Sequence, residues 1–128
     1  MFDIHICDFH NDLAHTFNLL YQRFPREETL WLEDICNDTD KDEYGMFSKR
    51  YMSCLGSVIW LEKEGFIRFD SQEGNDGFNY CTLTLKALQR LSRIETGHEL
   101  NCIHRLQYAM KQHISDELEE VIKHILHT

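Results

Sequence analysis

The segment from residue 55 to residue 91 constrains the fold more than any other part of the chain. Apolar residues recur at helical spacing up to Gly65, and a glycine there suits the left-handed cap that ends a helix. Residues 66–69 alternate as a strand does, and the following S-Q-E-G-N-D-G supplies the residues of a hairpin turn. Residues 78–83 give the returning strand, and Thr84 is placed to cap another helix. This order of elements predicts an α+β fold.

The residues before this segment predict three helices. The first is capped by Asp8 and ended by Pro25. Thr29 is placed to cap a short second helix, and the third should cover residues 46–64. The buried residues of the second helix would be Leu32, Ile35 and Cys36. Residues 37–45 are polar and acidic, so we expect a solvated loop there.

The C-terminal residues predict a helical extension. A break at Thr96-Gly97 separates a first domain, residues 1–94, from an extension, residues 95–128. Ser115 is placed to cap the last helix, which carries a strong apolar stripe. The stripe consists of Ile114, Leu118, Val121, Ile122 and Ile125. We expect it to form a homodimer; in the alternative, the extension folds back onto the first helix of the same chain.

Two sequence stretches resemble the winged helix-turn-helix DNA-binding domain superfamily, although they indicate no subfamily. They read V-I-W-L-E-K-E-G-F-I-R-F at residues 58–69 and Y-C-T-L-T-L-K-A-L-Q-R-L at residues 80–91. The matching positions are Leu61, Glu62, Gly65, Phe66, Ile67, Leu83 and Thr84. The resemblance covers about residues 8–94. It implies a three-helix core with a two-stranded wing, and a third helix that reads double-stranded DNA; the C-terminal helices are an addition to this frame.

The charge distribution allows DNA binding at one place only. The net charge is −9, and residues 46–94 are the one region in which bases outnumber acids. The candidate DNA contacts are Ser48, Lys49, Arg50, Ser53 and Arg68. With these contacts the chain would be a small dimeric transcriptional regulator. Its expected wing, however, carries Glu73 and Asp76, where a wing that contacts DNA often carries basic residues.

The acidic residues support an alternative function. They could imitate a row of phosphates and bind a basic protein, as an adaptor or a nucleic-acid-mimicking inhibitor that does not bind DNA. The candidate partner contacts are Glu33, Asp34, Asp38, Asp40, Asp42 and Glu43. A third interpretation is that these acids only keep a surface loop solvated.

Other function classes find little support in the sequence. None of the common nucleophile, phosphate-loop or metalloprotease motifs occurs, so we do not expect an enzyme. Five widely spaced cysteines predict reduced thiols in a cytoplasmic protein, without a disulfide framework. We expect no cofactor, no metal and no membrane partner.

Overall fold

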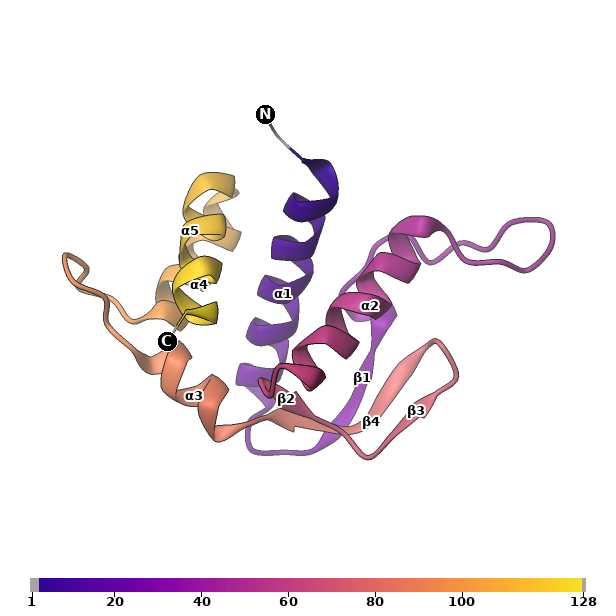
Figure 1. Cartoon of the computed structure of the whole chain (residues 1–128), viewed down its shortest axis with the longest axis horizontal. Coiled ribbons are helices and arrows are strands. Elements are labelled where there is room, and N and C mark those ends of the chain that lie inside the picture. Colours follow the sequence, from indigo (N-terminus) through magenta and orange to yellow (C-terminus); the bar gives the residue numbers. More distant parts are fainter. Residues whose placement is uncertain (1–2, 128) are drawn as a thin grey trace.

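The structure is a computed structural model that describes residues 3–127. Residues 1–2 of the first predicted domain and residue 128 of the second lie outside this range. The described part of the chain is an α+β fold with five α-helices and a small antiparallel sheet (Figure 1). Within it, no helix has both the length and the apolar character needed to cross a membrane. The α+β class predicted from the sequence is therefore confirmed.

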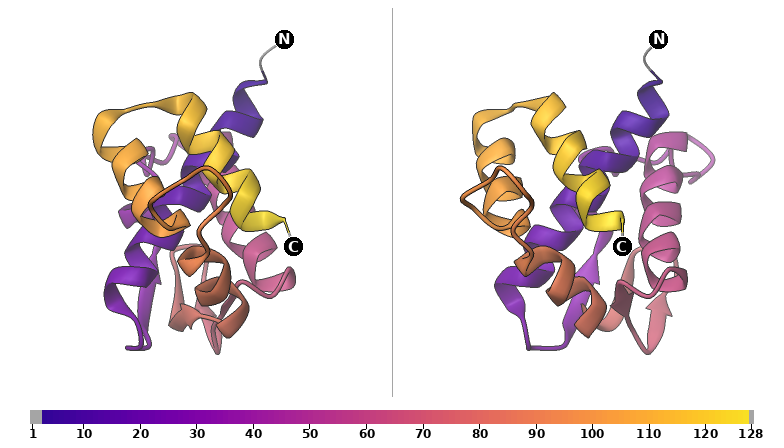
Figure 2. Two further views of the ribbon diagram at one scale, coloured as in Figure 1. Left: turned by 90° about the vertical axis from the view of Figure 1, so that its left-hand side faces the viewer. Right: turned by 60° about the vertical axis from the view of Figure 1, so that its left-hand side comes forward.

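Helix α1, Ile4–Arg23, lies at the centre of the molecule. It contacts α2, Lys49–Lys63, on one side, and α4, Cys102–Gln112, and α5, Ser115–Leu126, on the other (Figures 1 and 2). Because neighbours cover two of its sides, α1 buries polar side chains as well as apolar ones. Its buried residues are His10, Asp12, Leu13, Ala14, Thr16, Phe17 and Leu20.

The sheet is organised around β4, Gly77–Leu83. On one edge β4 pairs with β1, Glu28–Trp31, and on the other with β2, Ile67–Arg68, and β3, Ser71–Glu73. All pairings are antiparallel. The predicted hairpin is therefore confirmed, but residues 71–73, which were predicted to lie in the turn, form strand β3 instead. The tip of the hairpin lies beside the last residue of β1.

Gly65 and Thr84, the two residues predicted to flank the hairpin, have the predicted roles. Gly65 has a φ of 81° and follows α2 directly. Thr84 accepts a hydrogen bond from the Ala87 amide at 3.3 Å and caps α3, Leu85–Ser92. The Thr84 hydroxyl also donates to the Gly65 carbonyl at 2.6 Å, so one side chain joins both ends of the hairpin.

The predicted second helix is wrong. Thr29 lies in strand β1, and its hydroxyl donates to the Asn79 side chain on β4 at 3.1 Å instead of capping a helix. Only a 3-10 turn, Leu32–Asp34, remains of the helix. The strand forms because β4 satisfies its backbone groups. The predicted buried residues of this region, Leu32, Ile35 and Cys36, are buried.

Three other helix boundaries differ from the prediction. α1 begins at Ile4, so Asp8 lies inside the helix and does not cap it. α2 begins at Lys49 and is capped by Ser48. α5 begins at Ser115 after Ile114, with no side-chain cap, so the predicted Ser115 cap is wrong. The predicted caps of α1 and α5 identify these helices, but they lie five residues and one residue after the observed N-cap positions.

The predicted dimerisation stripe is buried inside the chain. Leu118, Val121, Ile122 and Ile125 are at most 7% exposed, and Ile114 is half-buried. They are covered because α5 packs against α1, α3 and α4. Arg90 helps to hold α5 in place, since its guanidinium donates to the Ile125 carbonyl at 2.9 Å. The alternative, in which the C-terminal helices fold back onto the first helix, is confirmed, and these residues do not offer a free dimer surface.

Candidate functional site

Four of the five residues predicted to contact DNA lie at the N-terminal end of α2, from its N-cap to its second turn. The Ser48 hydroxyl accepts a hydrogen bond from the Tyr51 amide at 3.1 Å, so this side chain caps the helix. Lys49 and Ser53 are exposed. Together with Arg50 they line a hollow of about 500 Å³ that also contains Asp3 and Asp8. The structure thus brings the predicted bases together, but beside carboxylates of α1.

Arg50 is held within the chain. Its Nη1 and Nη2 atoms donate to the two carboxylate oxygens of Asp12 at 2.8 and 2.5 Å, and its Nε lies 3.6 Å from Asp8. Asp12 is only 1% exposed. The hydrogen bonds to Asp12 raise the pKa of Arg50 above its usual range. A bidentate pair of this kind uses two of the five N–H donors of the guanidinium and neutralises its charge, which weighs against the phosphate contact predicted for Arg50.

Arg68 also has a partner within the chain. Its guanidinium lies 2.8 Å from the carboxylate of Glu27. Both side chains are well exposed, so this pair is weaker than the one between Arg50 and Asp12. Two of the predicted DNA contacts are Lys49 and Ser53, and among the described residues their side chains form no ion pair and no hydrogen bond.

The residues predicted to bind a basic partner are exposed. They are Glu33, Asp34, Asp38, Asp40, Asp42 and Glu43. Within residues 3–127, Asp34 alone of the six forms an ion pair, at 3.8 Å from Arg23. The acidic loop, residues 37–45, projects beyond the N-terminal end of α2 (Figure 1). It has a defined turn, because the Asp42 carboxylate accepts hydrogen bonds from the Tyr44 and Met46 amides at 2.9 Å.

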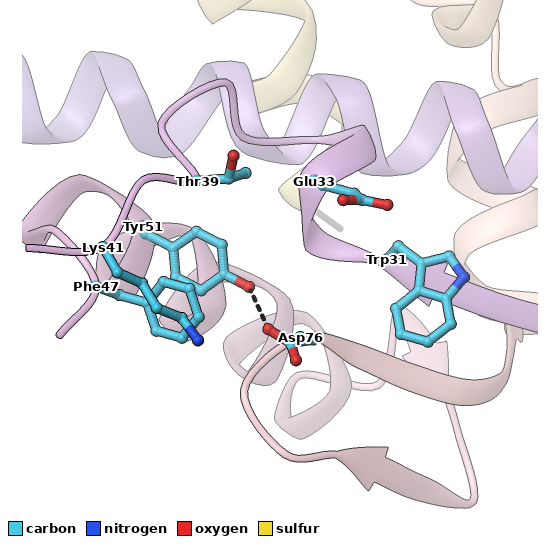
Figure 3. Close-up of a pocket in the computed structure, with 7 residues that line it drawn as sticks. All are labelled: Trp31, Glu33, Thr39, Lys41, Phe47, Tyr51 and Asp76. Carbon is cyan, nitrogen blue, oxygen red and sulfur yellow. Dashed lines mark hydrogen bonds between the residues drawn. The ribbon is translucent and has the colours of Figure 1, made fainter. Parts of the chain in front are cut away.

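A pocket of about 410 Å³ lies between the acidic loop, β1, the first turns of α2 and the hairpin tip (Figure 3). We call it the aromatic pocket. It is lined by Trp31, Glu33, Thr39, Lys41, Phe47, Tyr51 and Asp76. Among these, sequence reasoning had selected only Glu33 as a site residue. Four separate segments contribute to the pocket, so no local spacing could have identified it.

One wall of the aromatic pocket is a stacked pair of rings. Phe47 and Tyr51 have centroids 4.1 Å apart and an interplanar angle of 11°. Lys41 pairs with Phe47 across an isolated β-bridge, and its ammonium lies 4.7 Å from the centroid of the Phe47 ring. This is the geometry of a cation–π interaction. The pocket wall therefore already accommodates one cation, which comes from the chain itself.

The tip of the hairpin fixes the position of Tyr51. The phenol donates to the Asn75 carbonyl at 2.8 Å, and the Asp76 carboxylate lies 3.4 Å away (Figure 3). Burial, together with the negative charge of Asp76, raises the pKa of Tyr51 to about 12. The phenol is therefore a neutral hydrogen-bond donor over the physiological pH range.

Trp31 faces this wall from the other side of the pocket (Figure 3). Its side chain is 40% exposed, which is unusual for a large aromatic residue in a sheet. The indole rests against Gly77, where an added Cβ would lie 2.7 Å from Trp31 Cε3. Gly77 is thus needed for the close approach of this ring to β4. The carboxylates of Glu33 and Asp76 complete the lining.

The described residues contain no group of three or more His, Cys, Asp or Glu side chains arranged to hold a metal ion. Comparisons of the chain with protein-family models, with curated proteins and with solved structures find no match. The site offers the partly exposed ring of Trp31 and the Phe47 ring, together with two carboxylates that form no ion pair among the described residues.

Proposed function

We propose that the chain is an acidic protein-interaction module on a winged-helix frame, and that it binds a basic protein through the acidic loop and the residues around it. The partner would meet an exposed surface of carboxylates. Such a module would act as an adaptor, or as an inhibitor that occupies the nucleic-acid-binding surface of its partner. Electrostatic complementarity of this kind gives specificity and a fast association rate.

The order of the elements supports the winged-helix frame. Helix α1 is followed by β1, then by a turn and loop, by helix α2, and by the hairpin of β3 and β4. In this frame α2 corresponds to the reading helix and the hairpin to the wing. The second helix of the frame would be reduced to the 3-10 turn Leu32–Asp34 and the acidic loop. The sequence motif at Leu61, Gly65 and Thr84 supports the same frame.

One observation favours a basic partner: two of the three bases on the expected DNA surface have carboxylate partners within the chain, whereas most of the acids have no basic one among the described residues. Arg50 and Arg68 form ion pairs within the chain. Five of the six predicted partner-binding acids form none among residues 3–127. A DNA phosphate near α2 would meet Asp3 and Asp8 as well as Lys49. The two carboxylates would oppose the attraction of the phosphate by Lys49.

DNA binding by a winged-helix transcriptional regulator is the second candidate. It is favoured by the exposure of Lys49, Met52 and Ser53 at the N-terminal end of α2. In this case the Arg50 guanidinium would only position the helix, and Lys49 would be the principal phosphate contact.

A titration with two probes distinguishes the candidates. Fluorescence anisotropy would be measured with a labelled arginine-rich peptide and with a labelled short DNA duplex, at several salt concentrations. We expect the peptide to bind with an affinity that falls as salt rises, and the duplex not to bind even at low salt. Duplex binding that Lys49→Ala abolishes would overturn the proposal and establish the regulator.

Two matched triple variants locate the peptide site. Asp38→Asn/Asp40→Asn/Glu43→Gln removes three charges from the acidic loop, and Asp116→Asn/Glu117→Gln/Glu120→Gln removes three from α5. The loop variant should weaken peptide binding about tenfold, since each exposed charge pair contributes about 0.5 kcal/mol. The α5 variant should change it less than about twofold. Equal losses would mean that net charge alone attracts the peptide, which would contradict the proposed surface.

A further inference from the structure

The aromatic pocket combines the two kinds of group that recognise a planar cation. Trp31 and Phe47 offer ring faces, Tyr51, which is 2% exposed, supports the Phe47 ring from behind, and Glu33 and Asp76 offer carboxylates. A guanidinium stacks on aromatic faces and also donates hydrogen bonds in its own plane to carboxylates. We propose that the aromatic pocket binds one arginine side chain of the basic protein partner. This inference rests on the proposed function and names the contact on which specificity depends.

Lys41 provides an internal example of the interaction. Its ammonium lies over the Phe47 ring, held near it by the bridge between the two residues. Lys41 is exposed and lies in none of the ion pairs found among the described residues, so little holds its side chain in the pocket. An incoming guanidinium displaces this ammonium and takes over its place on the ring. Lys41 is thus a weak competitor for the site.

Shape and surroundings favour an arginine over a small free cation. The volume of about 410 Å³ exceeds what a single ammonium group fills and admits a long side chain. The lining combines residues of the acidic loop with Asp76 of the hairpin tip, so a residue that enters it also approaches Asp38 and Asp40. The remaining basic residues of a protein partner would meet those carboxylates. A free small cation would gain nothing from them.

The choice of arginine over lysine follows from the geometry of the lining. The two carboxylates lie on different segments, Glu33 after β1 and Asp76 before β4, with Trp31 on one side of them and the Phe47 and Tyr51 rings on the other (Figure 3). The five donors of a planar guanidinium reach two carboxylates while its face stays on a ring. A lysine ammonium is a strongly hydrated point charge and cannot stack.

The test uses the indole resonances of the two tryptophans. In the full chain, labelled with ¹⁵N, replacement Trp60→Phe assigns the two indole signals. The protein would be titrated with N-acetylarginine methylamide, and in parallel with the lysine derivative and with the uncharged citrulline derivative. We expect the arginine derivative to shift the Trp31 signal and to leave the Trp60 signal in place. Citrulline should produce no shift, and lysine should bind several-fold more weakly.

Two variants in the pocket and one outside it sharpen the result. Asp76→Asn should weaken binding of the arginine derivative about fivefold, because one charge-assisted contact is lost. Lys41→Ala should strengthen it about threefold, because the competitor is removed. Lys111→Ala, an exposed lysine on α4, removes the same charge away from the pocket and should have no effect. The amide spectrum of each variant shows whether it is folded.

The outcomes separate this inference from the proposed function. If the arginine-rich peptide binds through the acidic loop but the Trp31 signal and the pocket variants show no response, the pocket assignment is overturned while the proposed function stands. If the peptide does not bind but the arginine derivative shifts Trp31, the pocket assignment stands alone. Equal binding of citrulline, or of lysine, would overturn the assignment of an arginine guanidinium.

Discussion

Two charged regions lie on either side of the first turns of α2, and they differ in how their charges are satisfied. On the side of α1, the Arg50 guanidinium forms a bidentate pair with buried Asp12 and approaches Asp8. On the side of the hairpin tip, Glu33 and Asp76 line an open pocket beside aromatic rings. The first region stabilises the fold, and the second is available to a partner. Charged residues alone therefore do not identify a binding surface, and charges without a partner in the chain are the better indication.

The paired region should be the more sensitive to mutation. Arg50→Ala leaves the Asp12 carboxylate buried without its partner, so we expect a loss of about 3 kcal/mol in the free energy of unfolding. The neighbouring Lys49 is exposed, and Lys49→Ala should change the free energy of unfolding by less than about 0.5 kcal/mol. Urea denaturation of the two variants measures both values.

A double variant checks the cause of this loss. Asp12→Ala/Arg50→Ala removes both charges and should cost less than the two single variants together. If Arg50→Ala proves as mild as Lys49→Ala, the ion pair contributes little, and Arg50 would again be a candidate for contacts with DNA.

This contrast also shows which parts of the site could be predicted from the sequence. Gly65 and Thr84 were assigned correctly, because a left-handed cap and an N-cap depend on neighbouring residues. The Arg50 side chain was predicted to be free because its partner, Asp12, lies 38 residues earlier in the chain. No local rule reports such a pair.

The same reason explains the other misses. Thr29 precedes a stretch that reads equally well as a short helix or as a strand, and only its pairing with β4 decides between them. The apolar stripe on α5 was recognised correctly, but the stripe itself does not say whether the same chain or a second copy covers it. The aromatic pocket needs four segments to come together, so its chemistry emerged only with the fold.

The aromatic pocket should be sensitive to substitution of Gly77, because the Trp31 ring lies close to the backbone there. Gly77→Ala places a methyl group 2.7 Å from the Trp31 ring, so we expect a loss of about 2 kcal/mol from overpacking and a displaced indole. Gly56 on α2 has free space around its Cα, and Gly56→Ala should stabilise the protein by about 0.5 kcal/mol. Thermal denaturation compares the two variants, and a shift of the Trp31 indole signal should accompany only the first. A stable Gly77→Ala variant would mean that Trp31 moves freely.

Tyr51 links the two regions, because it lies on α2 and donates to the hairpin tip. Tyr51→Phe removes this hydrogen bond and should cost about 1 kcal/mol at neutral pH. The folded-state pKa of about 12 lies above the unfolded value of about 10. The contribution of this group is therefore complete below pH about 10 and is lost as the pH rises toward 12.

Absorbance of the phenolate, followed from neutral to alkaline pH, tests this prediction. Tyr51→Phe should remove a component with a midpoint near pH 12, whereas Tyr44→Phe, which alters a residue that is 81% exposed, should retain it. Retention of that component in Tyr51→Phe would show that Tyr51 is not held as described.

His10 on α1 is a third kind of polar group, a buried ring without a hydrogen-bond partner at Nδ1. Its substitution should have the smallest effect on stability. It is 6% exposed, and its Nδ1 has no hydrogen-bond partner among the described residues. Burial lowers the pKa of His10; Glu119 on α5 opposes this shift, and Lys123 on the same helix adds to it. Because the folded-state pKa is depressed, the stabilising contribution of neutral His10 is present above the unfolded value of about 6.5 and is lost as the pH falls below it.

His10→Gln should therefore lose less stability than the wild-type protein between about pH 7 and about pH 5.5. His15→Gln, which alters an exposed histidine on the same helix, should follow the wild-type protein. Thermal unfolding of the three proteins at the two pH values gives the comparison. If all three lose the same stability, the acid sensitivity arises at other groups. If His10→Gln alone resists acid, the contact between α1 and α5 contains a buried group whose protonation destabilises the fold. In this respect His10 differs from Arg50, whose charge is paired within the chain. It also differs from the pocket carboxylates, which remain accessible to a partner.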